Sequence, residues 1–328
     1  MFLRLVGLHF VVGLLYVAIL GTNPADAIGS MFATFPTAFG FFVTKAWWAI
    51  AAFGVLIAVS DRQVLLPRIK PAIYVLIACN LFFLTFTMVK TTLPHVVVFW
   101  ADPLFAAMDR TLHLGRDPWE WTHGLGDVVP LWLGEWLYMG LWLIPATYFP
   151  VFITLFDGDS QRRDRYLWLY LVGWAVLGNL MAQTFMSAGP IFYDRVYDGD
   201  RFAALMDTLR TGGVWNTGVA YIQDYLWTAY STQNLRVGSG ISAFPSVHVG
   251  MVTVWAFYLG ERWKFTIPLG ILLVAAFVFF SVHFGWHYAV DGYVSIVVIW
   301  AAWFMIRRMQ NRHRHAANVA LQRNNAVS

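Results

Sequence analysis

Residues 266–306 read TIPLGILLVAAFVFFSVHFGWHYAVDGYVSIVVIWAAWFMI, two apolar stretches joined by a short segment that contains His287 and Asp291. At about 1.5 Å per helical residue, each stretch can cross most of the hydrocarbon core of a bilayer. Titratable side chains are costly near lipid, so their presence between two such stretches indicates a functional site. This part of the sequence therefore predicts membrane helices with chemistry at the point where they meet.

The rest of the chain has the same character. Of its 328 residues, 59% are hydrophobic and only 12% are charged, about half the charged fraction of a typical soluble domain. The 17 Trp, 14 Tyr and 27 Phe fit aromatic belts at the two membrane interfaces. The net charge of +4 comes from short loops and the C-terminal tail, so it does not indicate a nucleic-acid partner. We expect an all-α, polytopic integral membrane protein, and the single Cys79 excludes an intrachain disulfide.

The apolar runs predict about eight transmembrane helices, over residues 2–20, 38–59, 72–89, 131–155, 167–188, 247–260, 266–284 and 289–306. The first run has a second interpretation, because Arg4, the apolar stretch and Ala25-Asp26-Ala27 also resemble a signal peptide with its cleavage site. With the N-terminus inside, 14 of the 22 Lys and Arg residues fall on the inner side. This bias predicts that both termini are cytoplasmic and that His248, His287 and Asp291 lie at the extracytoplasmic face.

These three residues belong to two short motifs, Phe244-Pro245-Ser246-Val247-His248 and His287-Tyr288-Ala289-Val290-Asp291. His287 and Asp291 are four residues apart, which on one helix face allows a hydrogen bond. A carboxylate on one imidazole nitrogen makes the other a better nucleophile or base, and His248 can handle a second proton. Ser246 is expected to cap a helix whose free N–H groups can hold a phosphate, although an ordinary cap looks the same. The set suits phosphoryl transfer through a phosphohistidine; a purely structural His–Asp pair is the alternative.

A metal site is a second alternative at this position. His283, His287 and Asp291 are spaced i, i+4, i+8 and would line one face of a continuous helix. Gly285 falls between them and is expected to break that helix. We therefore expect neither a metal nor a cofactor.

Phe-Pro-Ser-x-His followed by His-Tyr-x-x-Asp-Gly resembles the type 2 phosphatidic acid phosphatase (PAP2) superfamily. The motif details, with the small-residue-Pro-aromatic segment Ser187–Tyr193, are most similar to its inositolphosphotransferase-like branch, which includes inositol phosphorylceramide synthases. The resemblance covers about residues 165–306. It implies three parts: N-terminal membrane helices with an outer amphipathic loop (1–130), a PAP2-like catalytic helical core (131–306) and a basic cytoplasmic tail (307–328).

The resemblance also implies roles for single residues. His287 would be the nucleophile, Asp291 its orienting partner, His248 the acid and then the base, and Ser246 part of the phosphate seat. The chain departs from the superfamily pattern where Ser281 replaces an arginine, and no Lys-x6-Arg-Pro element precedes the first motif. Transferring phosphate needs a cation. We expect Arg236 to supply it, or otherwise Arg195, although either can be a solvated loop charge.

The resulting expectation is an enzyme that transfers a phosphorylated head group between lipids, with a lipid phosphoester as substrate and the bilayer as its surroundings. Hydrolysis of a lipid phosphate, such as phosphatidic acid or a polyprenyl diphosphate, is the first alternative. A non-catalytic lipid-binding or transport protein is the second. The sequence does not indicate an oligomeric state.

Overall fold

The computed structural model describes the backbone of residues 1–125, 128, 130–235 and 238–327; side chains are not described at residues 30–31, 34–39, 41–43, 45–46, 316–321 and 323–327. Within this described part every regular element is a helix and no strand occurs, which confirms the all-α class.

Four helical segments are long and apolar enough to cross a membrane: α1 (Phe2–Ile19), α3 (Arg62–Val96), Lys264–His283, which includes α14 (Ile267–His283), and the Ala289–His315 part of α15 (Ala289–Val327). A fifth span is present if Leu131–Leu141 and Leu143–Phe156, which meet at a bend of 43°, cross together. These apolar helices agree with a membrane protein, but the expected number of about eight spans is not confirmed.

The missing spans have physical causes. The run expected at 247–260 is α13 (Val247–Arg262), whose 16 residues reach only about 24 Å against a core of about 30 Å. The runs expected at 131–155 and 167–188 are each divided by a π-helical stretch. The first comprises α6 (Leu131–Glu135), η2 (Trp136–Leu141) and α7 (Leu143–Phe156), and the second α8 (Ser160–Leu171), η3 (Val172–Met181) and α9 (Ala182–Thr184). The run at 38–59 lies in α2 (Pro24–Val59), where many side chains are not described.

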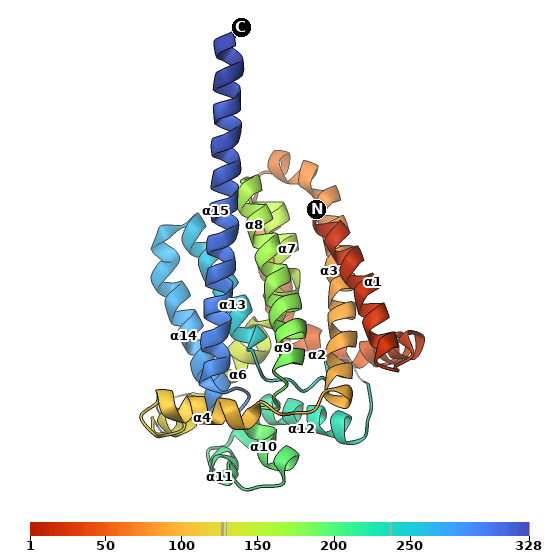
Figure 1. The fold of residues 1–328 in the computed structure, drawn as a ribbon, viewed down its shortest axis with the longest axis vertical. Helices are drawn as coiled ribbons and strands as arrows, with labels where there is room; N and C mark the ends of the chain where they lie inside the picture. Colours follow the sequence, from red (N-terminus) through yellow and green to blue (C-terminus); the bar gives the residue numbers. More distant parts are fainter. Residues whose placement is uncertain (126–127, 129, 236–237, 328) are drawn as a thin grey trace.

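The long helices stand side by side, and a group of short helices gathers at one end of the bundle (Figure 1). The short helices are α4 (Asp102–Leu112), α5 (Pro118–His123), α10 (Pro190–Tyr197), α11 (Ala203–Thr211) and α12 (Gly218–Ser231). Figure 1 shows α4 lying across the ends of the long helices, opposite the C-terminal tip of α15. The starts of α13 and α15 point to this same end, so both sequence motifs are brought to it.

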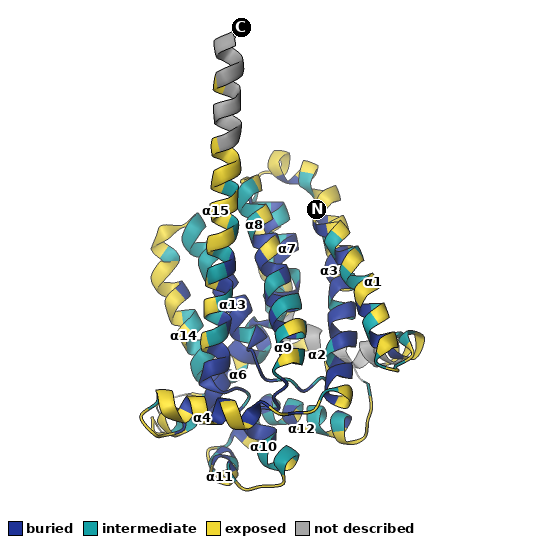
Figure 2. Cartoon of the chain, viewed as in Figure 1, coloured by how far each residue is buried: buried dark blue, intermediate teal, exposed yellow. Residues whose placement is uncertain are grey.

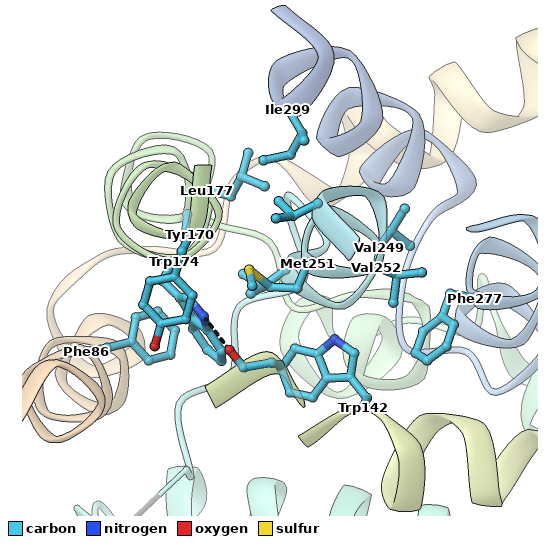
Figure 3. Packing of buried hydrophobic residues seen from close by; sticks show 14 of the residues in the cluster. Phe86, Trp142, Tyr170, Trp174, Leu177, Val249, Met251, Val252, Phe277 and Ile299 are labelled. Atoms are coloured by element: carbon cyan, nitrogen blue, oxygen red, sulfur yellow. Dashed lines mark hydrogen bonds between the residues drawn. The ribbon is translucent and has the colours of Figure 1, made fainter. Parts of the chain in front are cut away.

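The core is formed by aromatic and aliphatic side chains around α13, whose inward-facing side is buried (Figure 2). Val249, Met251 and Val252 of α13 pack among Trp142 and Trp174 from the two π-helix-containing segments (Figure 3). The indole N–H of Trp174 donates to the carbonyl of Ala146 at 3.2 Å, so this buried polar group is satisfied. Because lipid tails are as apolar as these side chains, close van der Waals packing, rather than removal from water, holds α13 at the centre of the bundle.

Gly189 lies where the chain packs closely against the second motif. It has φ +86°, and a Cβ placed there would lie 2.5 Å from the carbonyl oxygen of Trp286. The amide of Ile191 then donates to the carbonyl of Gly285 at 2.9 Å. Only glycine combines this backbone conformation with so close an approach. Residues 189–191 thereby hold the segment that carries His287.

Gly189→Ala should therefore destabilise the protein, because the strained backbone alone costs about 1–3 kcal/mol and the added methyl group meets backbone atoms. We expect a clear drop in the melting temperature of the purified protein in detergent. Gly199→Ala is the control, since nothing lies within 4 Å of a Cβ at that position. Identical melting of the two variants would show that the close approach at Gly189 does not exist.

Candidate active site

Ser246 caps α13, as the sequence predicts. Its hydroxyl accepts from the amide of Val249 at 3.4 Å, and its own amide donates to the carbonyl of Asp291 at 3.3 Å. The first turn of α13 is thus tied to the first turn of α15. Ser246 is fully buried, so the unpaired amides that follow it lie inside the protein, where a helix N-terminus attracts an anion most strongly.

His287 and Asp291 are in contact, with Nδ1 of the imidazole 3.2 Å from Oδ2 of the carboxylate. The expected reason, a shared helix face, is wrong. Gly285 has φ +71°, α15 begins only at Ala289, and His287 lies in the loop before it. Asp291 occupies the third position of α15 and also accepts from the amide of Tyr288 at 3.1 Å. The carboxylate therefore orients His287 through the geometry of a helix start rather than of a helix side.

The His287 side chain is only 9% exposed. Burial, with a smaller contribution from the positive charge of Lys90, lowers the pKa of His287 to about 3. The imidazole is therefore neutral near pH 7, and a neutral ring whose Nδ1 contacts a carboxylate leaves Nε2 as its nucleophilic atom.

His248 lies in the first turn of α13, with its ring centroid 6.2 Å from that of His287. The ring is stacked between Tyr138 and Trp142, at centroid distances of 4.3 and 3.9 Å. Both aromatic residues come from the irregular segment around η2, and π-helical turns are frequent at functional sites. The two rings fix the plane of His248 and leave its nitrogens without a hydrogen bond among the described residues, so they can serve a ligand.

His283 does not join this group. It ends α14, and its ring stacks on that of His123 at a centroid distance of 3.9 Å. Nε2 of His123 lies 2.8 Å from the carbonyl of His283, which fixes the pair. Because Gly285 separates α14 from α15, His283 shares no helix face with His287 and Asp291, and the i, i+4, i+8 arrangement is not formed.

Asp102, in the first turn of α4, is the centre of the surrounding hydrogen bonds. Its buried carboxylate accepts from three different segments: the hydroxyl of Ser187 and the amides of Ala188 and Gly189 (2.8–2.9 Å), the hydroxyl of Tyr197 (3.2 Å) and the hydroxyl of Tyr288 (3.1 Å). Tyr288 directly follows His287. One carboxylate thus joins the small-residue-Pro-aromatic segment to the second motif.

Two further residues of α4 hold the motifs from the same helix face. Asp109 accepts from the amides of Ala289 at 2.7 Å and Val290 at 2.9 Å, so its carboxyl oxygens cap the first turn of α15. Burial raises the pKa of Asp109 to about 7, against the opposing effect of these two amides. Phe105 stacks on Phe244 of the first motif with ring centroids 4.1 Å apart. α4 is therefore the support on which both motifs rest.

Lys90 is the cation that the structure brings to the site. Its ammonium group, near the end of α3, donates to the carbonyl of Ser242 at 3.0 Å. Ser242 lies four residues before the helix cap at Ser246, and a Cβ on Gly240 would lie 2.2 Å from the carbonyl of Lys90. The chain before the first motif is therefore packed directly on this lysine, whose charge also acts on His287.

Several buried polar atoms around the two motifs have no hydrogen-bond partner among the described residues. They include the hydroxyls of Tyr138 and Ser242 and Oδ1 of Asp291. Buried polar groups are normally paired, since an unpaired group costs about 1–3 kcal/mol. Two donors and one acceptor left open beside two histidines are what a bound polar ligand would satisfy.

The two arginines expected to bind phosphate have different outcomes. Arg236 lies outside the described residues. Arg195 is exposed on α10, with its guanidinium 5.1 Å from the ring centroid of Trp227. None of its described contacts is with Ser246, His248 or His287, so its role as a phosphate ligand stays a prediction.

The sequence analysis missed Lys90, Asp102 and Asp109. A lysine at the end of an apolar run normally extends its charged group toward the lipid headgroups. The sequence therefore did not distinguish Lys90 from an ordinary interfacial lysine. The two acids of α4 are seven residues apart on an amphipathic helix, a spacing that places them on one face. This spacing can be recognised in the sequence. The hydrogen-bond partners of the two acids cannot, because they lie 85 to 186 residues away in the chain.

Comparison with known proteins agrees with this arrangement. A sequence model described as PAP2 superfamily matches residues 104–305, more than half of the chain. The match begins within α4, before the expected start of the catalytic core at residue 131. No curated protein matches the chain, and no solved structure matches it.

Asp102→Ala should be among the most damaging substitutions in the protein. It leaves several buried donors unpaired, at about 1–3 kcal/mol each, and releases the segment that carries His287. We expect a large drop in the melting temperature in detergent, and a smaller one for Asp102→Asn, which keeps one acceptor. Asp207→Ala, at a side chain that is 77% exposed, should melt like the wild type. Equal melting of the Asp102 and Asp207 variants would contradict the central place of Asp102.

Proposed function

Because the chain belongs to the PAP2 superfamily, we propose that it is a membrane phosphotransferase that acts on lipid phosphoesters through a phosphohistidine at His287. Phosphatase-type or phosphotransferase chemistry is what this superfamily supports in general. The observation that carries the specific proposal is the contact of His287 with Asp291 at 3.2 Å, beside His248. A nucleophile, its orienting group and a second proton carrier are thereby within reach of one phosphate.

In the first half-reaction, Nε2 of His287 attacks the phosphorus atom of the donor lipid. The bond from phosphorus to the leaving oxygen breaks, and His248 gives a proton to that oxygen. Burial lowers the pKa of His248 well below its usual value, so in this proposal His248 takes up that proton only when the anionic phosphate is bound beside it. The products are the departing alcohol and a phosphorus–nitrogen bond at His287. Asp291 stabilises the positive charge that develops on the imidazole, as the orienting acid does in other His–Asp pairs.

In the second half-reaction, a hydroxyl group of the acceptor attacks the same phosphorus atom. His248, now neutral, takes the proton of that hydroxyl, and the phosphorus–nitrogen bond breaks to restore His287. His248 ends the cycle protonated, so protons and phosphoryl group balance. Only the acceptor distinguishes transfer from hydrolysis, because a lipid hydroxyl and water enter at the same step.

Charge on the transferring phosphate is neutralised in this proposal by three groups. Lys90, whose side-chain nitrogen donates to the carbonyl of Ser242, provides a cationic group in place of the arginine that the superfamily pattern has where this chain has Ser281. The amides after Ser246 provide the positive end of the α13 dipole. The unpaired hydroxyls of Tyr138 and Ser242 provide neutral donors. Donors fixed before the reaction stabilise developing charge without reorganisation, which is their advantage over water.

Transfer of a phosphorylated head group between lipids is the reaction we favour. The motif details of the inositolphosphotransferase-like branch support it, and so does the burial of His287 and Asp291. A site that excludes water favours an organic acceptor. The excess of basic residues at the other end of the bundle supports an extracytoplasmic site with cytoplasmic termini.

Hydrolysis of a lipid phosphate is the second candidate, because the partial exposure of His248 gives water a route to the general base. Purified protein incubated with a labelled phospholipid and a lipid alcohol, with products separated by mass, distinguishes the two. A new phospholipid establishes transfer, whereas released phosphate or a free phosphorylated head group establishes hydrolysis.

His287→Ala should abolish turnover and the acid-labile label that a phosphoenzyme carries. Asp291→Asn should reduce turnover by about 10²–10⁴-fold, because the amide no longer stabilises the charged imidazole. The measurement is the rate of product formation by protein of wild-type melting temperature. Near-normal turnover by His287→Ala would eliminate the phosphohistidine mechanism. Absence of turnover in the wild type as well would favour a binding or transport protein.

Lys90→Met should lower turnover by about 10²–10³-fold, the usual effect of removing one donor to developing charge. Methionine keeps the unbranched stem, so packing is little changed. Lys70→Met is the matched control, because Lys70 is exposed on the same helix at its opposite end. Equal rates for the two variants would show that Lys90 is not the cation that binds the phosphate. Arg236 and Arg195 would then be the next residues to test.

A further inference from the structure

A long groove runs along the helices away from the catalytic residues. α13 forms its floor and α14 and α15 its walls, and α13 lies behind the space between those two helices in Figure 1. Its volume is about 1450 Å³, more than the 300–1,000 Å³ of a usual small-molecule pocket. Small residues let α13 and α14 approach closely at its base: a Cβ added at Gly270 would lie 3.0 Å from the Cβ of Ala256.

The middle of the groove is apolar. Ile271 of α14 and Trp300 of α15 face it with 66% and 53% of their surface exposed. Val274 and Ile296 continue the two walls. No charged residue lines this stretch among the described residues. A surface of this kind within a membrane-spanning bundle suits a hydrocarbon chain.

The end of the groove far from the catalytic residues is basic. It is lined by five cationic residues (Arg162, Arg165, Lys264, Arg307 and Arg314) and two acidic ones (Asp159 and Glu261). Two of the cations are paired, Arg165 with Glu261 and Arg162 with Asp157, each at 2.6 Å. The other three make no ion pair with any described residue, so this end has uncompensated positive charge.

The guanidinium of Arg307 is held in a fixed position in which it can bind an anion. It lies 5.0 Å from the ring centroid of Trp303, and the indole N–H of Trp303 donates to Glu261. A guanidinium stacked on a fixed ring loses less freedom when it binds, and its planar fork matches a phosphate. Arg314 lies two turns further along α15 and lines the same groove.

We propose that this groove binds an anionic glycerophospholipid, with its phosphate at Lys264, Arg307 and Arg314 and an acyl chain along the apolar walls of α14 and α15. The eleven residues from Val297 to Arg307 span about 15 Å, which is half of a bilayer core of about 30 Å. One leaflet's lipid therefore fits between the basic end and the middle of the groove. This site goes beyond the proposed reaction and does not depend on it.

The charge pattern decides between a lipid and a helix from a second copy of the chain. A helix from a second copy could pack against the apolar and small residues of the groove. It would leave the three unpaired cations at the basic end without a partner. A phospholipid needs both parts, since its chain takes the apolar walls and its phosphate the guanidinium groups. The basic end thus identifies the occupant.

The test uses the full-length protein in neutral detergent, with bound lipid counted by native mass spectrometry. Phosphatidylglycerol and phosphatidylcholine of identical chains are the probes. We expect the anionic lipid to bind more tightly, and Arg307→Ala with Arg314→Ala to weaken it by about tenfold or more. Arg308→Ala with Arg312→Ala removes the same charge from the same helix at residues that do not line the groove, and should have little effect.

A second pair of variants tests the apolar part without changing charge. Ala275→Trp fills the groove and should weaken lipid binding, whereas Leu272→Trp, on the same helix but outside the groove, should not. If the two double arginine variants lose affinity for the anionic lipid equally, the binding reflects a general attraction between basic residues and anionic lipid. That result would overturn the site. Equal binding of both lipids, or a dimer that Ala275→Trp dissociates, would overturn it as well.

Discussion

The buried carboxylate of Asp102 is the interaction on which the rest of the structure depends. A charge removed from water is tolerated only when donors replace the lost solvation, and here five protein donors do so. They come from segments that are distant in the chain, so satisfying one charge fixes the relative positions of all of them. The loop that carries His287 is one of these segments. Removal of any one donor is therefore expected to be felt at the nucleophile.

The placement of charge around the site follows a simple division. Asp102 and Asp109 are each turned toward backbone amides or hydroxyls, so their negative charge stabilises the scaffold. Asp291 is turned toward His287, where negative charge supports the imidazole. Positive potential comes from Lys90 and from the start of α13. The hydrogen bonds to these carboxylates reduce the repulsion that an anion would meet beside them. The arrangement is therefore compatible with the phosphate site proposed above.

The parts predicted correctly from sequence were those that depend on neighbouring residues. The cap at Ser246 and the contact between His287 and Asp291 both arise within one turn of chain. The reason given for the contact was wrong, because Gly285 delays the start of α15 and the pair meets at a helix start. Lys90 and Asp102 could not be found in this way, since their partners are set by packing. The expected number of about eight spans is not confirmed, and two of the expected runs contain π-helical turns, which hydropathy does not reveal.

The position of α4 has a consequence for any attempt to isolate the catalytic half of the chain. The family match begins at residue 104, after Asp102 has already entered the helix and well after Lys90. A fragment trimmed to the matched region would keep both histidines and Asp291. It would lack the carboxylate that positions them and the lysine packed against Ser242. A fragment of this chain that keeps these contacts must therefore extend back into α3, so its border is set by hydrogen bonds rather than by sequence similarity.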